Sequence, residues 1–185
     1  MLVITGPSGV GKGSVIRALR ARRPQIGLSI SATTRSPRAG ETDGVDYHFL
    51  SEEQFEQRVR DGDFVEYADY AGQRYGTLRS ELEASPADVE LIVLEIELQG
   101  ARQVRASMPD AVQVFIAPPS FDSLRERLIG RGTDSAETIE QRLAVAHDEL
   151  AAQDEFSEVI VNDSLDAAVD ALDALVESQL GGAVD

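Results

Sequence analysis

The sequence predicts an α/β domain in which helices cover both faces of a parallel sheet. Short apolar runs typical of buried strands alternate with helical patterns along most of the chain, the order expected of a doubly wound sheet. The clearest run covers residues 90–95, where apolar side chains follow one another almost without interruption, as in a strand buried on both faces. In such a sheet the binding groups lie at the carboxyl ends of the strands.

The elements expected outside the middle of the chain alternate in type. A strand over residues 1–5 is followed by an amphipathic helix that opens over residues 14–20, and then by a strand over residues 26–31. Farther along, strands are expected at residues 90–95, 112–116 and 158–161, and helices at residues 99–107, 121–128, 137–153 and 165–176.

Residues 32–86 interrupt this alternation. Residues 45–50 and 64–70 have the character of strands and flank an acidic helix over residues 52–60, which predicts a small α+β insertion able to close over a second substrate. A second irregular stretch, residues 130–134, interrupts a helical region and is typical of a mobile lid.

The composition narrows the class of protein. A chain of 185 residues with 42% hydrophobic residues suits one domain with a sizeable core. It contains no cysteine and no apolar run close to the ~20 residues of a membrane span, so we expect a cytoplasmic protein without a membrane partner. A net charge of −16 argues against a nucleic-acid polymer as partner, because such binding requires a basic surface. These properties do not predict the oligomeric state.

One lysine stands in a glycine-rich segment directly after the first strand. Every other fixed positive charge in the chain is an arginine, so we expect this position to require an ammonium group. The segment fits most of the phosphate-binding loop pattern G-x-x-x-x-G-K-[ST], in which main-chain N–H groups surround a polyphosphate and the lysine reaches its β- and γ-phosphates. The alternative is a chance glycine-rich turn. The predicted loop comprises Gly6, Pro7, Ser8, Gly9, Val10, Gly11 and Lys12.

The loop departs from this pattern at Gly13, where a serine or threonine would hold Mg²⁺. The next hydroxyl belongs to Ser14, so either Ser14 takes this role or the ion depends on water and a carboxylate. We expect Glu95, at the end of the most apolar strand, to hold magnesium-bound water, with a structural salt bridge as the alternative.

Two arginines, Arg35 and Arg38, lie three residues apart near the start of the insertion. Their forked guanidinium groups suit the dianionic phosphate of a small acceptor, to which Tyr47 and Tyr75 could also donate hydrogen bonds. The alternatives are two ordinary surface arginines and two core aromatic residues.

Several segments together resemble guanylate kinases, and they occur in that family's order over nearly the whole chain. They include the glycine-rich loop, SATTRSPRAGE at residues 31–41 and GVDYHF at residues 44–49. The others are RYGT at residues 74–77, LEIELQG at residues 94–100, FIAPPS at residues 115–120, GRGT at residues 130–133 and VND at residues 161–163.

The resemblance implies a single domain that transfers a phosphoryl group from ATP, with Mg²⁺, to GMP and to dGMP. It implies a three-layer P-loop kinase core with a central parallel sheet, formed by residues 1–31, 87–126 and 155–185. The GMP-binding insertion would be residues 32–86, and a helical lid would be residues 127–154.

The resemblance also implies roles for individual residues. The residues implied to bind the GMP phosphate are Arg35, Arg38, Tyr47 and Tyr75. Those implied to bind the guanine are Ser31, Glu66, Thr77 and Glu97. The residues implied to bind ATP are those of the glycine-rich loop, the two residues that follow it, Gly13 and Ser14, and Asn162. The catalytic charges would be Lys12, Arg35 and the lid residues Arg131 and Arg142. We expect Arg125 and Arg127 to be ordinary surface residues.

The chemistry of guanine supports the assignment of its site independently. Guanine offers donors at N1 and N2 and an acceptor at O6, so a carboxylate such as Glu66 can accept from both donors while hydroxyls such as Ser31 and Thr77 donate to the oxygen. Adenine would leave these groups unpaired, which supports discrimination of roughly 10⁴–10⁵. One departure from the family is Glu97, which stands where an aspartate is usual and could shift the contact with guanine or with Arg35.

Two other functions remain open from the residues. A non-catalytic guanylate-kinase-like binding module typically lacks the phosphate loop or the lid arginines, whereas this chain keeps Lys12, Arg131 and Arg142. A ribose bisphosphate kinase of similar sequence has no purine in its acceptor, and so has no use for Glu66, Tyr75 and Thr77 together.

Overall fold

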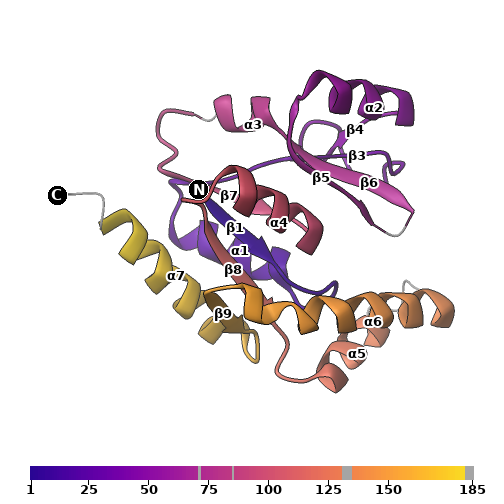
Figure 1. Ribbon diagram of the computed structural model, residues 1–185. Helices are drawn as coiled ribbons and strands as arrows, with labels where there is room; N and C mark the ends of the chain where they lie inside the picture. Colours follow the sequence, from indigo (N-terminus) through magenta and orange to yellow (C-terminus); the bar gives the residue numbers. More distant parts are fainter. Residues whose placement is uncertain (71, 85, 131–134, 182–185) are drawn as a thin grey trace. The chain divides into compact units, whose positions relative to one another are not determined.

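The computed structural model describes residues 1–70, 72–84, 86–130 and 135–181 (Figure 1). The chain forms two compact units. One consists of Met1–Val3 with Ile26–Val112, and the other of Ile4–Gln25 with Gln113–Asp185. We call the first the acceptor unit and the second the donor unit, after the group of residues described below in each. Among the described residues, no helix combines the length and the apolar character that crossing a membrane requires.

A five-stranded sheet with the order β2-β7-β1-β8-β9 confirms the expected parallel α/β architecture. The boundary between the two units passes through its middle strand, β1 (Leu2–Thr5), which is buried along its whole length. In the acceptor unit β2 (Ile26–Leu28) pairs in parallel with β7 (Leu91–Glu95), and in the donor unit β8 (Val112–Ala117) pairs in parallel with β9 (Glu158–Val161).

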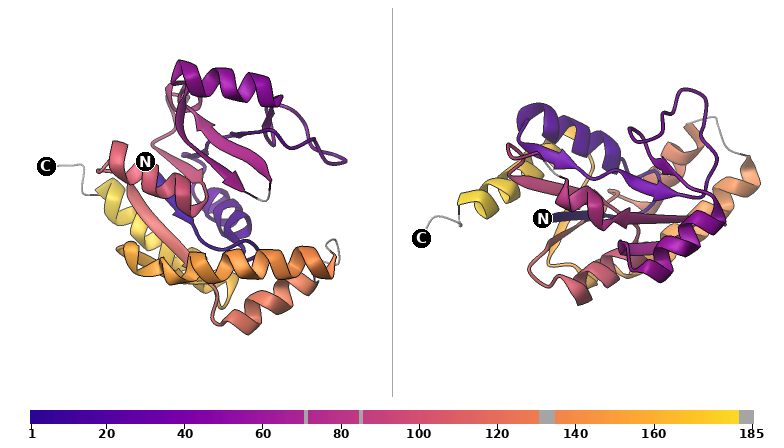
Figure 2. Two further views of the ribbon diagram at one scale, coloured as in Figure 1. Left: turned by 45° about the vertical axis from the view of Figure 1, so that its right-hand side comes forward. Right: turned by 90° about the horizontal axis from the view of Figure 1, so that it is seen from above.

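The helices of the donor unit are α1 (Lys12–Arg22), α5 (Phe121–Gly130), α6 (Ala136–Ala151) and α7 (Leu165–Gly181), with a 3₁₀ turn at Gln153–Glu155. Helices α5 and α6 lie side by side in both views of Figure 2. Arg22 and Arg23 at the end of α1 form ion pairs with Asp170 and Asp173 of α7. These ion pairs connect α1, the helix that follows the glycine-rich loop, to α7, the last helix of the chain.

The acceptor unit contains a second sheet with the order β4-β3-β6-β5. Its strands are β3 (Ser31–Thr33), β4 (His48–Phe49), β5 (Phe64–Tyr70) and β6 (Gln73–Leu78). Helix α2 (Glu52–Asp61) covers this sheet, and its Phe55 stacks on Phe64 with ring centroids 4.5 Å apart. A capping box between Ser51 and Gln54 begins α2, and Gly62 in the left-handed conformation ends it.

Four details of this unit differ from the sequence prediction. The single strand expected over residues 26–31 is divided between two sheets, because the main chain of Ser29 still bonds to Val93 whereas that of Ile30 donates to the Glu81 carboxylate. The strand expected over residues 45–50 is reduced to the two residues of β4. Strand β6 and the short helix α3 (Arg79–Glu83) were not predicted.

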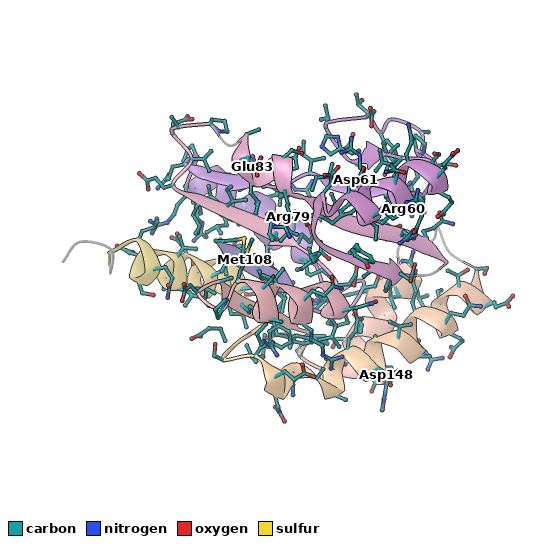
Figure 3. All side chains as sticks on the ribbon, turned by 45° about the horizontal axis from the view of Figure 1, so that its top comes forward. Arg60, Asp61, Arg79, Glu83, Met108 and Asp148 are labelled. Carbon is teal, nitrogen blue, oxygen red and sulfur yellow. The ribbon has the colours of Figure 1, made fainter. Side chains whose placement is uncertain are left out.

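Helix α3 follows β6 directly and is tied to the end of α2. Arg79, labelled in Figure 3, donates from Nε to the carbonyl of Gly62 at 2.9 Å, and its main-chain N–H donates to the carbonyl of Asp63 at 2.8 Å. The other helix of this unit, α4 (Leu98–Ser107), follows β7 as expected. Its buried face carries Gly100, Ala101 and Val104.

Candidate active site

The glycine-rich loop of the donor unit connects β1 to α1 and is shaped by glycines. Gly6 and Gly11 have φ angles of 139° and 103°, in a region that side chains strongly disfavour. A Cβ on Gly6 would lie 2.2 Å from the carbonyl oxygen of Ile116, and one on Gly11 would lie 2.7 Å from Nδ2 of Asn162. Glycine is therefore required at both positions for the loop to lie against its neighbours.

Helix α1 begins at this loop without a side-chain cap and without an acidic residue in its first turn. The positive end of the helix dipole is thus available to an anion. Gly13 and Ser14 lie exposed in this turn. Among the described residues, no three His, Asp or Glu side chains gather as a metal site. Mg²⁺ bound to a nucleotide requires few protein ligands, because phosphate oxygens and water complete its shell.

The lysine predicted to bind phosphate is 8% exposed. Nζ of Lys12 donates to the carbonyl of Gly6 at 2.5 Å and lies 3.4 Å from that of Pro7. The ammonium therefore lies over the loop that it belongs to. It can exchange these carbonyl bonds for stronger bonds to phosphate oxygens, because both partners would then be charged.

Two side chains support the loop at the carbonyl of Val10. Nδ2 of Asn162 donates to this oxygen at 2.8 Å, and an Arg127 guanidinium nitrogen donates to it at 3.1 Å. Arg127 also donates to the carbonyl of Asn162 at 2.8 Å, so the three groups form one network. The expectation of a surface role is wrong for Arg127, because its guanidinium is half-buried against the loop.

The described part of the expected lid, residues 127–154, contains the end of α5 and the whole of α6. Arg142 lies half-buried in α6, whereas Arg131 falls outside the described residues. Arg125 pairs with Glu140 across these helices, with both side chains largely exposed. Its assignment to the surface is confirmed.

In the acceptor unit, the register of the second sheet brings three predicted guanine residues into one row. Ser31 of β3 lies opposite Thr77 of β6, and Thr77 in turn lies opposite Glu66 of β5. Residues that face each other across strands share a face of the sheet. Oγ1 of Thr77 donates to Oε1 of Glu66 at 2.7 Å, so the hydroxyl and the carboxylate hold each other in place.

Glu66 is an unusual carboxylic acid because its side chain is only 3% exposed. Burial raises its pKa to about 7, bonds from Thr77 oppose that shift, and the neighbouring charge of Glu97 adds to it. Among the described residues, Oε2 of Glu97 is buried without a hydrogen-bond partner. Glu97 stands at the N-terminal end of α4 but does not cap it. The two carboxyl groups thus lie near each other, and hydrogen-bond donors of a ligand could satisfy them.

A second group of residues forms a cationic site around Arg35. Its guanidinium lies 5.2 Å from the ring centroid of Tyr47, and the rings of Tyr47 and Tyr75 are 6.2 Å apart in an edge-to-face arrangement. The pKa of Tyr47 is raised by burial and then by the negative charge of Glu95. Glu95 at the end of β7 therefore lies near enough to Tyr47 for its charge to act on the phenol. Arg38, in contrast, has an exposed side chain.

Glu41 orients Arg35, a role that the sequence analysis did not assign. Its two carboxylate oxygens accept from the two terminal nitrogens of Arg35 at 3.0 Å and 2.9 Å. The Glu41 carboxylate also accepts from the main chain of Arg38 at 2.6 Å. These bonds, with the one to Arg35 first, lower the pKa of Glu41, and the bond to Glu41 raises the pKa of Arg35. The guanidinium is thus fixed in direction and keeps its charge.

Comparison with known proteins agrees with this arrangement. The guanylate kinase family model matches residues 1–179. A guanylate kinase of Frankia casuarinae is 54% identical over 176 residues, which are 95% of this chain and 96% of that protein. A guanylate kinase of Synechococcus sp. (strain CC9311) is 53% identical over 167 residues, which are 90% and 88% of the two chains.

Comparison with solved structures shows that the fold is shared as well. The crystal structure of guanylate kinase from Anaplasma phagocytophilum is 30% identical, with a TM-score of 0.79 over 97% of this chain and 85% of that one. The SH3-kinase fragment of tight junction protein 3 shares the fold at 12% identity, with a TM-score of 0.53 over 97% and 56% of the two chains. With matched sequence along nearly its full length and a site in each unit where the family motifs fall, the chain belongs to the guanylate kinase family.

Proposed function

We propose that the chain transfers the γ-phosphoryl group of ATP, with Mg²⁺, to GMP and to dGMP. The observation that carries the proposal is the buried Glu66 carboxylate, held by Thr77 beside the carboxylate of Glu97. Two adjacent carboxyl groups in a buried site cost free energy, and that cost is offset when a ligand brings donors to them. The N1–H and N2–H groups of guanine are such donors, and adenine has no N–H at its N1 position.

The donor unit supplies the groups for the triphosphate. We assign ATP to Gly6, Pro7, Ser8, Gly9, Val10, Gly11, Gly13 and Ser14, with Lys12 at the β- and γ-phosphates and Asn162 supporting the loop. Ser14 of this unit would hold Mg²⁺, and Glu95, which belongs to the acceptor unit, would hold water bound to the ion. Phosphoryl transfer requires positioning and neutralisation of charge rather than covalent catalysis, so the arginines Arg35, Arg131 and Arg142 complete the catalytic set.

The acceptor unit supplies the groups for GMP. Arg35, Arg38, Tyr47 and Tyr75 would bind its phosphate, and Ser31, Glu66, Thr77 and Glu97 its guanine. The GMP phosphate is itself the nucleophile, so no general base is needed. We divide the chain accordingly into a core, a GMP-binding part at residues 32–86 and a lid at residues 127–154.

Two observations weigh against the other candidate functions. A ribose bisphosphate offers no base to the row formed by Ser31, Thr77 and Glu66, and it would leave the buried carboxylate without donors. A binding module has no use for a buried lysine held over a phosphate-binding loop.

A coupled assay for ADP formation tests the proposal with ATP and four acceptors: GMP, dGMP, AMP and ribose 1,5-bisphosphate. We expect turnover with GMP and dGMP, and a kcat/KM for AMP lower by roughly 10³ or more. Faster turnover with ribose 1,5-bisphosphate than with GMP would assign the chain to the other kinase. Absence of turnover with all four acceptors, together with measurable GMP binding, would make it a binding module.

A further inference from the structure

Helix α4 comes unusually close to the Glu66 carboxylate at Gly100. A Cβ on this glycine would lie 2.1 Å from Oε2 of Glu66 and 2.9 Å from its Cδ, which is closer than non-bonded atoms can approach. The three nearest heavy atoms all belong to this one side chain, with Cγ at 3.3 Å. The space that any other residue would fill at this position is occupied by the carboxylate.

Glycine has a low intrinsic propensity for the α-helix. It lies in the first turn of α4, where alanine would favour the helix more, and its φ angle is not among the positive ones of the chain. The local backbone therefore does not explain the glycine. The close approach of Glu66 does explain it.

Gln103, one turn farther along α4, holds the residue next to Glu66. Its Nε2 donates to the carbonyl of Tyr67 at 2.6 Å, and its Oε1 accepts from the main-chain N–H of Tyr67 at 3.2 Å. Strand β5 is the last in the order of its sheet, so its outer edge presents main-chain groups that a side-chain amide can pair. Gln103 thus takes the place of a neighbouring strand at this point.

The strand needs such support because its pairing is irregular where Glu66 lies. The register between β5 and β6 shifts between Phe64 and Glu66, which indicates a β-bulge that redirects the following side chain. The Thr77 hydroxyl fixes Oε1 of the carboxylate. The position of Oε2 depends on the space at Gly100, and that of the main chain depends on Gln103.

We propose that Gly100 and Gln103 are positioning residues that set the selectivity for guanine through Glu66, without contacting the base. The inference rests on the proposed function, because it takes Glu66 as the acceptor for the guanine donors. A methyl group at Gly100 would displace Oε2 while Thr77 retains Oε1. The carboxylate would then rotate and present one aligned acceptor in place of two.

The first test is Gly100→Ala, with Ala106→Ser on the exposed last turn of the same helix as the matched control. We expect the KM for GMP to rise about tenfold or more, while the KM for ATP and the kcat at saturating GMP stay within about threefold of the wild type. The control should match the wild type. A KM for GMP within about twofold of the wild type in Gly100→Ala would overturn the inference.

A double-mutant cycle shows whether Gly100 acts through Glu66. In a Glu66→Ala background the clash is absent, so Gly100→Ala should change the dissociation constant of GMP by less than about twofold, measured by calorimetry. An equal loss in both backgrounds would show that Gly100 acts by another route, and would contradict the inference.

Gln103→Met keeps the test decisive if Gly100→Ala does not fold. It retains the volume of the side chain but removes both bonds to Tyr67, and should raise the KM for GMP about threefold or more with the KM for ATP unchanged. An unchanged KM for GMP in a folded Gln103→Met would refute the role of Gln103. Failure of the proposed function would appear differently, as a wild type that does not phosphorylate GMP.

Discussion

The two units of the molecule offer different kinds of groups to the ligands proposed for them. In the donor unit the site is formed largely by main-chain groups, namely a glycine loop, the first turn of α1 and one lysine over the carbonyls of that loop. In the acceptor unit it is formed by side chains in register across a sheet, with Glu66 buried among them. Main-chain N–H groups recognise any phosphate, whereas side chains distinguish one base from another. The comparison predicts that changes in the donor unit reduce kcat or affinity for ATP, and that changes in the acceptor unit reduce affinity for GMP.

The largest effect should come from the donor unit. Lys12→Ala removes the only ammonium at the loop, and we expect kcat to fall by roughly 10³ because the charge that moves between the phosphates loses its counter-charge. Stopped-flow and steady-state assays measure this loss, and circular dichroism checks that the variant is folded. A well-folded variant with near-normal kcat would remove Lys12 from the catalytic set.

Glu66→Gln should have the next largest effect, and this effect should be on the KM for GMP instead of on kcat. The amide turns one acceptor into a donor that faces the donors of guanine, so the KM for GMP should rise by about 10² while the KM for ATP changes little. If instead both constants rose together, the division between the units would be wrong.

The same substitution should stabilise the fold above neutral pH. The folded-state pKa of Glu66, about 7, exceeds its usual value of 4.5, so ionisation costs the folded protein stability as the pH rises through this interval. Above pH 7 that cost is on the order of 3 kcal/mol, because each pKa unit corresponds to ~1.4 kcal/mol. Glu66→Gln should therefore raise Tm at pH 8 and leave it nearly unchanged at pH 4. Equal shifts at both values would mean that the raised pKa is not the cause.

Affinity for GMP should depend on pH through the same group. The protonated acid cannot accept from both guanine donors, so binding should strengthen as the pH rises toward and past about 7, and then level off. Calorimetric titrations from pH 5.5 to 8.5 measure this, with Glu66→Gln as the control that retains the ionisation of the GMP phosphate. Identical pH profiles for the two proteins would contradict a titrating Glu66.

The smallest effect should come from the support of the loop. Arg127→Gln removes bonds to the carbonyls of Val10 and Asn162 but leaves the Asn162 bond to Val10 in place. We expect a rise of about three- to tenfold in the KM for ATP, with the KM for GMP unchanged. A change confined to the KM for GMP would break the comparison between the units.

The sequence predicts those elements of the fold and the site that depend on residues close together in the chain, and it fails for those that depend on distant residues. The loop around Lys12 and the strands with continuous apolar residues are set by neighbours in the chain, and they were placed correctly. Strand β6 was missed because its residues carry Tyr75 and Thr77 for the site rather than an alternating apolar pattern. The role of Arg127 was missed because its partners, Val10 and Asn162, are 117 and 35 residues away. Gly100 lies within a motif that the sequence reveals. The reason for a glycine at this position becomes visible only in the structure, where the Glu66 carboxylate packs against it.

The solitary lysine also gives the protein an unusual chemical surface. Because every other fixed cation is an arginine, the only side-chain amine of the chain is the one held 2.5 Å from the carbonyl of Gly6. Reagents that acylate ε-amines have no exposed lysine to attack and can reach only this group, which is 8% exposed. Acylation of Lys12, read by mass spectrometry at this residue and separately from the α-amino group of the chain, would therefore report occupancy of the proposed nucleotide site without any engineered label.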